Sequence, residues 1–264
     1  MQLFRFQKGY SPILISNPHG GSVVLPEIAE LMNESALDTT NADKYLARIF
    51  DLPTLESAAM ITANMSKVVV DLLADPGSQA MVPVTTQTGE PIYSIGNEPD
   101  DSEIAKRREH YFDPYFDQLQ SELQRLCGRF PTVVLIDVHA LPMDTSNGEP
   151  GQPVQSIAEI RFPESLQANY RELVDHLHQQ FDFENSGVVV NPTNDPNRIV
   201  RHAADHFTGG ASVLPFELYL NPCNYLDPDD GSLDYEGRKR VSSMIEPILF
   251  SMLRWAEAKS VNAV

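Results

Sequence analysis

The chain has 264 residues, and 42% of them are hydrophobic, which is enough for a sizeable buried core. Its 37 acidic and 19 basic side chains give a formal net charge of −18 at pH 7. Such a charge repels polyanions and so excludes nucleic acid and anionic membrane surfaces as expected partners, while a small anionic substrate held by a local cluster of cations remains compatible with it.

The cysteine content and the N-terminal sequence pattern favour an intracellular protein. Cys127 and Cys223 are the only cysteines, too few for a disulfide framework or a thiolate zinc site, so we expect two free thiols. We find no signal-peptide pattern and no apolar run long enough to span a bilayer, and we therefore expect a cytoplasmic protein. No linker or repeat divides the sequence, which predicts one domain over residues 1–264 and is compatible with a homo-oligomer.

Apolar runs and helical periodicities alternate along the chain. We expect strands at 13–16, 68–72, 132–138, 187–191 and 211–220, the last interrupted by Pro215. We expect helices at 38–50, 102–127, 165–181 and 235–258, with a kink at Pro114, and a long loop over 77–101. This order predicts an α/β fold with a mixed, mostly parallel sheet flanked by helices, whose chemistry collects at the carboxyl ends of the strands.

Two histidines stand at such strand ends. His19 follows the first apolar run and precedes two glycines, which let a backbone approach a ligand closely. His139 ends the most hydrophobic strand, two residues after Asp137. Because side chains alternate along a strand, Asp137 and His139 face the same way, and Asp137 is placed to orient the imidazole or to complete a ligand set. A histidine in a turn without a function is the alternative for His19 taken alone.

A catalytic zinc ion usually takes three protein ligands, so a carboxylate is needed beside the two histidines. Asp43, at the start of an expected helix, is our first candidate, with Glu27 and Asp38 as alternatives. Asp43 could instead be a helix N-terminal charge interacting with the macrodipole.

Glu217 lies in an otherwise apolar strand. An ionised carboxylate is costly there unless it is paired, faces a cleft or is used in chemistry. A zinc hydrolase needs a general base, and Glu217 suits that role. The alternative is an edge-strand residue that faces water.

Short motifs in the right order over nearly the whole chain resemble those of N-formylglutamate amidohydrolases. The matching positions are 16–21, 42–43, 46–51, 66–71, 75–76, 89–93, Arg107, Tyr111, Pro114, Tyr115, 135–139, 194–196 and the strand that carries Glu217. The resemblance implies a sandwich like that of the zinc carboxypeptidases (phosphorylase/hydrolase-like). It also implies one Zn2+ held by His19, Asp43 and His139, with Glu217 as catalytic base and Asp71 among the substrate-binding residues. The implied reaction is hydrolysis of an N-acyl amide bond, as by a deformylase, on a small N-acyl amino acid such as N-formylglutamate.

Two positions depart from the family pattern. Leu73-Ala74 stand where the family usually has Asn-Arg, and Phe116 stands where it tends to have His. The loss of a cation and an imidazole weakens recognition of a dicarboxylate. The nearby basic residues Arg198, Arg201 and His202 could replace that charge or could form an exposed basic loop.

These departures leave other functions open. The rivals are a zinc amidase for another N-acyl amino acid or a small peptide, a descendant that binds a ligand without catalysis, and a purely structural α/β domain. A His/carboxylate site also accepts divalent metals other than zinc.

Overall fold

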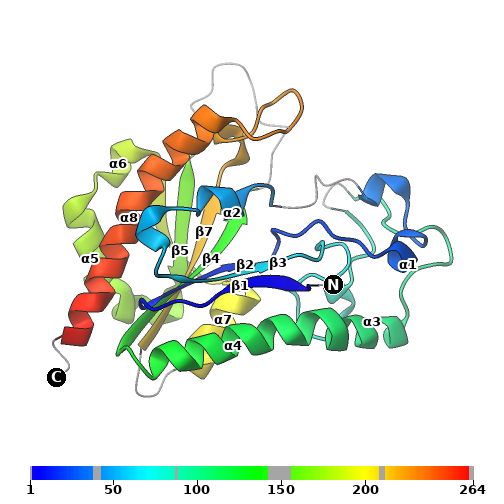
Figure 1. The fold of residues 1–264 in the computed structure, drawn as a ribbon, viewed down its shortest axis with the longest axis horizontal. Coiled ribbons are helices and arrows are strands. Elements are labelled where there is room, and N and C mark those ends of the chain that lie inside the picture. The colour runs from blue at the N-terminus through cyan, green and yellow to red at the C-terminus, as the bar shows by residue number, and fades with distance from the viewer. Residues whose placement is uncertain (1, 38–42, 87–88, 142–155, 208–211, 262–264) are drawn as a thin grey trace.

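A computed structural model describes residues 2–37, 43–86, 89–141, 156–207 and 212–261. A seven-stranded sheet crosses it in the spatial order β1-β3-β2-β4-β7-β5-β6 (Figure 1). The strands are β1 (Phe4–Gln7), β2 (Ile13–Asn17), β3 (Ala59–Ala63), β4 (Thr132–Ala140), β5 (Ala158–Pro163), β6 (Val188–Thr193) and β7 (Ser212–Leu220). The β1–β3 and β5–β7 pairs are antiparallel and the other four are parallel. The predicted α/β fold with a mixed, mostly parallel sheet is therefore confirmed; the division into domains stays a prediction.

Helices cover both faces of the sheet. The α-helices are α1 (Pro26–Ala29), α2 (Leu46–Ile49), α3 (Asp101–Arg107), α4 (Asp113–Cys127), α5 (Gln167–Gln180), α6 (Phe183–Ser186), α7 (Arg198–His206) and α8 (Tyr235–Val261). Elements α2, α5 and α8 pack on one face, and α4 and α7 pack on the other. Among the described residues, no helix is long and apolar enough to cross a membrane, and both cysteines are free thiols.

The central strand β4 shows why its sequence is apolar throughout. Val134, Ile136 and Val138 belong to the core on the α8 side, while Val133 and Leu135 belong to the core on the α4 side. Because both faces are covered, successive side chains are all buried, as in parallel sheets generally.

The strand predicted at 68–72 is wrong. Those residues form turns, in which the backbone amides of Val69 and Val70 donate to the carbonyl of Ser66. The strand in this part of the chain is β3, which ends at Ala63. Val68, Val69 and Val70 are buried in the core on the α4 side without joining the sheet. An apolar run indicates that a segment is buried, and burial alone does not distinguish a strand from a packed turn.

Two expectations about helices are also corrected. The helix predicted over 38–50 is reduced, within the described residues, to α2, because Tyr45 takes a left-handed conformation (φ 64°) that no α-helix contains. The kink predicted at Pro114 is also wrong in position. The irregularity is a single π-helical turn, Arg108–Phe112, that joins α3 to α4, and Pro114 lies in the first turn of α4.

Pro215 does not interrupt β7. It stays in register opposite Leu135 of β4, and its carbonyl accepts a hydrogen bond from Tyr170 Oη (2.6 Å). Strand β5 pairs with β7 only from Glu217 to Leu220, and the missing N–H therefore removes no ladder bond on that side.

Candidate metal centre

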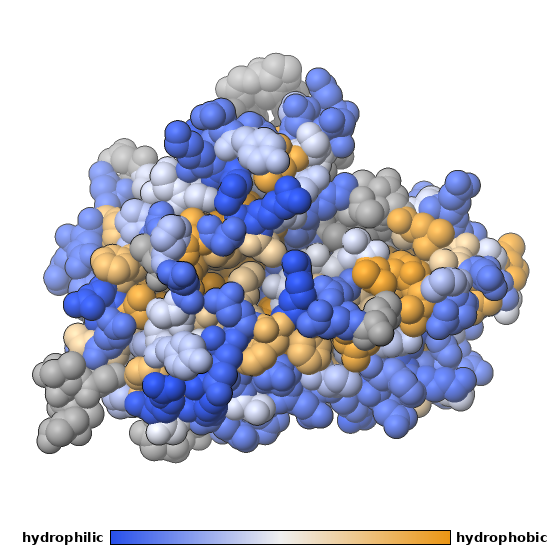
Figure 2. All heavy atoms as spheres, viewed as in Figure 1, coloured by the Kyte–Doolittle hydropathy of each residue, from blue (hydrophilic) through white to orange (hydrophobic). Residues whose placement is uncertain are grey.

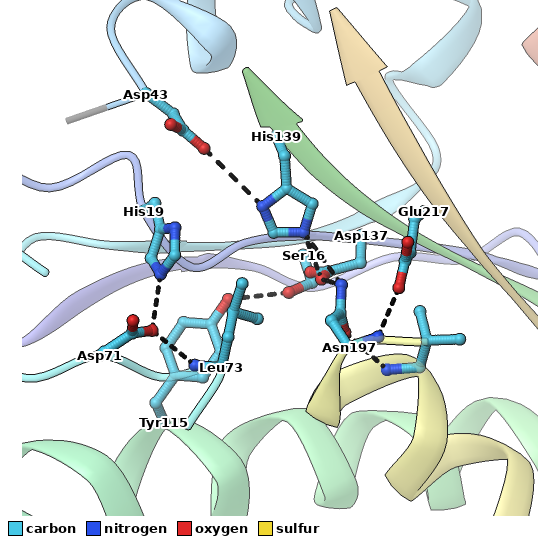
Figure 3. A network of polar contacts seen from close by, with 11 residues as sticks. Ser16, His19, Asp43, Asp71, Leu73, Tyr115, Asp137, His139, Asn197 and Glu217 are labelled. Carbon is cyan, nitrogen blue, oxygen red and sulfur yellow. Dashed lines mark hydrogen bonds and ion pairs between the residues drawn. The ribbon is translucent and has the colours of Figure 1, made fainter. Parts of the chain in front are cut away.

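Three buried side chains meet at the carboxyl ends of β2 and β4. His19, Asp43 and His139 each offer a ligand atom, and these atoms lie within 4.8 Å of one another (Figure 3). His19 lies two residues after β2 and His139 lies near the end of β4, so the parallel pairing of these strands brings them together. The loop before α2 adds Asp43, whose amide donates to the His19 carbonyl (2.9 Å).

The other two candidates for the third ligand stand apart. Glu27 is exposed on α1 and is not part of this group, and Asp38 lies outside the described residues. Within the part of the chain that the structure describes, Asp43 is therefore the carboxylate that joins the two histidines.

Each imidazole is held by a second carboxylate. His19 Nε2 lies 2.9 Å from Asp71 Oδ1, and His139 Nε2 lies 2.7 Å from Asp137 Oδ2. The prediction that Asp137 and His139 face the same way is confirmed. With Nε2–H donated to a carboxylate, Nδ1 is the ring nitrogen left for a metal ion, and His139 Nδ1 lies on the Asp43 side (Figure 3). Asp71, expected among the substrate-binding residues, is placed by the structure against His19, where the Leu73 amide also donates to it.

The electrostatics of this group suit a bound cation. Burial alone would lower the pKa of His139, but Asp137 and Asp43 outweigh it and raise that pKa to about 10. Burial alone would raise the pKa of Asp43, but His139, His19 and Lys67 hold it below its usual value. Asp43 Oδ2 is buried without a hydrogen-bond partner, 3.7 Å from His139 Nδ1, and an unsatisfied buried carboxylate oxygen is costly. Two imidazoles and a carboxylate make up a zinc donor set, so these residues fit a divalent ion.

Asn197, which the sequence analysis did not single out, connects the surrounding groups. As the N-cap of α7, it accepts from the Val200 amide through Oδ1 (3.1 Å). Its Nδ2 donates to Asp137 Oδ2 (2.8 Å) and lies 3.2 Å from His139 Nε2. The backbone N–H of Asn197 donates to Glu217 Oε1 (2.5 Å). The N-cap preference of asparagine before a helical run is the pattern that could have found it.

Glu217 is buried beside this network, with only 2% of its surface exposed. It pairs in register with Asp137, and Figure 3 places it on the other side of His139 from Asp43 and His19. Burial first, and then the charge of Asp137, raise the pKa of Glu217. The alternative of an edge residue facing water is wrong, since β7 lies between β4 and β5.

The basic residues expected near the site lie on α7 rather than in an exposed loop. Arg198 and Arg201 pair with Asp75 (3.2 and 3.5 Å). The Arg198 guanidinium lies over the ring of Phe116 (5.2 Å), and the ring of His202 meets the same phenylalanine (5.9 Å). The two residues therefore surround one of the positions that depart from the family pattern.

Comparison with known proteins identifies the family. The family model described as N-formylglutamate amidohydrolase matches residues 11–217, which is more than half of the chain. The chain belongs to the N-formylglutamate amidohydrolase family. The fold agrees: an N-formylglutamate amidohydrolase from Ralstonia eutropha JMP134 superposes over 100% of both chains (TM-score 0.71, 16% identity). A gene product from Agrobacterium tumefaciens superposes over 96% of both chains (TM-score 0.66, 16% identity).

Two curated relatives of this chain share only part of their length with it. The N-formylglutamate deformylase of Pseudomonas aeruginosa is 28% identical over 148 residues, 53% of this chain and 56% of that protein. The N-formylglutamate deformylase of Pseudomonas putida is 27% identical over 148 residues, 53% of this chain and 55% of that protein. The matched part thus spans only about half the length of these relatives.

Proposed function

We propose that this protein is a zinc-dependent amidohydrolase that cleaves the amide bond of a small N-acyl amino acid of the N-formylglutamate type. The observation that carries the proposal is the buried group of His19, Asp43 and His139, in which a carboxylate backs each imidazole. Membership of the amidohydrolase family supports it.

The reaction adds water across the amide: oxygen bonds to the carbonyl carbon, the C–N bond breaks, and a proton goes to the departing nitrogen. A divalent ion in this site supplies Lewis-acid chemistry, since it lowers the pKa of water toward ~7 and polarises the carbonyl. Glu217 takes the water proton and delivers it to the nitrogen. Its raised pKa brings it nearer to the working pH, as a general base requires, and Asn197 holds its carboxylate in place.

Arg198 is the cation proposed to hold the substrate carboxylate or the developing oxyanion. It is adjacent to Asn197, and its Nε is buried without a hydrogen-bond partner. Arg201 and His202 extend the same basic face of α7. Occupancy by a ligand would supply the hydrogen-bond acceptor that this Nε lacks.

A second candidate is a zinc amidase for another N-acyl amino acid or a small peptide. Leu73-Ala74 and Phe116 favour it, because the family pattern has a cation and an imidazole at these positions. A ligand-binding descendant without catalysis is the remaining alternative.

The test combines metal analysis with a substrate panel. We expect about one zinc ion per chain, lost in His19→Ala and His139→Ala, and hydrolysis of N-formyl or N-acetyl amino acids by the wild type. Glu217→Gln should keep the metal and lose turnover by about 10²–10⁴-fold, the usual contribution of a general base. The control is Glu122→Gln, a buried glutamate that pairs with Arg125 on α4, and it should keep turnover. Full activity of Glu217→Gln would disprove the role of Glu217, and a wild type that takes up no metal would disprove the mechanism.

A further inference from the structure

A groove of about 1040 Å³ opens beside the metal centre, on the face of the sheet that carries α2. Strands β1, β3 and β2 form its floor, and the segment from Asp43 to Glu56 forms its wall. Figure 2 looks onto this side of the molecule, where hydrophobic surface lies between hydrophilic side chains. Because Asp43 lines the groove and also belongs to the metal group, a ligand in the groove is next to the metal centre.

A row of polar side chains crosses the floor of the groove. Arg5 on β1 pairs in register with Thr62 on β3, and Thr62 pairs in register with Asn17 on β2. Residues directly opposite each other share a face of the sheet, so these three side chains form one row. Two strand spacings make the row about 10 Å long, and it runs from β2, the strand that His19 follows, to the edge strand.

Asn17 is the inner end of this row. Its side chain is fully buried, and among the described residues neither Nδ2 nor Oδ1 has a hydrogen-bond partner. Gly20 leaves room for this amide, because a Cβ there would lie 2.5 Å from Asn17 Nδ2. An unsatisfied buried amide is costly, and a ligand that offers both a carbonyl and an N–H would satisfy it.

The wall of the groove is held in an unusual backbone conformation. Tyr45 has φ 64°, a left-handed conformation that is rare for a residue other than glycine. It turns the chain two residues after Asp43, and the Arg48 guanidinium lies over the Tyr45 ring (5.6 Å). Strain of this kind is common at ligand-binding sites.

Among the residues that the structure describes, two arginines on this groove have no carboxylate partner. Within the described residues, no carboxylate oxygen is recorded within 4.0 Å of Arg5 or Arg48, although Asp51 and Glu56 also line the groove. In a chain of net charge −18, two such cations on one groove indicate a site for an anionic group.

We propose that this groove binds the part of the substrate beyond the scissile bond, with an amide at Asn17 and a terminal carboxylate at Arg5 and Arg48. The substrate class is then an N-acylated dipeptide or a longer acidic peptide. The inference rests on the proposed function and, of its two candidates, specifies the amidase that acts on a small peptide. It agrees with the size of the groove, which suits a ligand larger than formylglutamate, and with Ala74 in place of the arginine in the family pattern.

The experiment measures binding separately from turnover. N-formyl-alanyl-glutamate is titrated calorimetrically into zinc-loaded Glu217→Gln as the free acid and with its α-carboxyl amidated. The free acid should bind about tenfold more tightly, the usual value of one charge-assisted contact. Adding Arg5→Ala should remove that difference, and adding Asn17→Leu should weaken both ligands. The control Arg171→Ala, an exposed arginine on α5, should change nothing.

Equal binding of acid and amide, or an Arg5→Ala variant that behaves like Arg171→Ala, would overturn the proposal. Because Arg5 is exposed on an edge strand, we expect Arg5→Ala to fold, and the comparison of acid and amide remains decisive if Asn17→Leu fails to fold. The failure of the proposed function looks different. If the groove binds the dipeptide with the expected Arg5 dependence but the wild type hydrolyses no member of the panel, the groove stands and the amidohydrolase does not.

Discussion

At the scale of single residues, the centre depends on how its two imidazoles are oriented. His19 and His139 each donate Nε2–H to an aspartate, and this leaves both Nδ1 atoms for a ligand. Asp137 and Asp43 also make the His139 imidazole more basic, so in the metal-free protein a proton competes with the ion at this residue.

This competition predicts how metal affinity changes with pH. The pKa of His139 is raised to about 10, so below that value the metal-free imidazole is protonated and must lose a proton to bind an ion. We therefore expect the apparent affinity for Zn2+ to rise about tenfold per pH unit between pH 7 and 9. A competition titration against a chromophoric chelator measures it, and calorimetry in two buffers counts the released proton. An affinity that is flat over this range would contradict the raised pKa.

At the scale of elements, the turn after β2 positions His19. Gly21 bridges Ser66 in the loop after β3, and a Cβ at Gly21 would lie 2.3 Å from the backbone carbon of Asn64. No side chain other than hydrogen fits such an approach, which explains the glycines after the histidine.

Gly21→Ala should therefore destabilise the protein by about 2–3 kcal/mol and weaken metal binding, because the turn must move to make room. Gly128→Ala is the matched control: it lies at the end of α4, and its Cβ would come no closer than 3.6 Å to another atom. Denaturant unfolding and zinc titration of both variants check the prediction. If the two variants behaved alike, the turn would not be under this constraint.

At the scale of the whole molecule, the candidate metal site joins distant parts of the chain. The residues that could hold an ion come from the loop after β2, the loop before α2 and the end of β4, and α7 joins the network through Asn197. An ion that binds only the folded state stabilises all of these elements at once.

Metal removal should therefore lower the melting temperature. A zinc concentration of 1,000 times Kd adds about 4.1 kcal/mol, which for a chain of this size corresponds to roughly 10 °C. Scanning calorimetry with zinc and with a chelator measures the shift, and His139→Ala should show none. If the melting temperature of the wild type did not change with zinc, the ion would not bind the folded protein.

The sequence by itself determined the α/β class and the positions of β2, β4 and β7, because their apolar runs are buried on both faces. It also singled out His19, two residues after β2, and His139, near the end of β4. Asp43 needed the family resemblance as well, since an aspartate at the start of an expected helix has an ordinary explanation. Only the tertiary structure decided that Val68–Val70 pack as turns, that Asn197 caps α7 against Glu217 and Asp137, and that a polar row crosses β2, β3 and β1. These features depend on contacts between segments far apart in the chain, and local periodicity carries no information about which segments will meet.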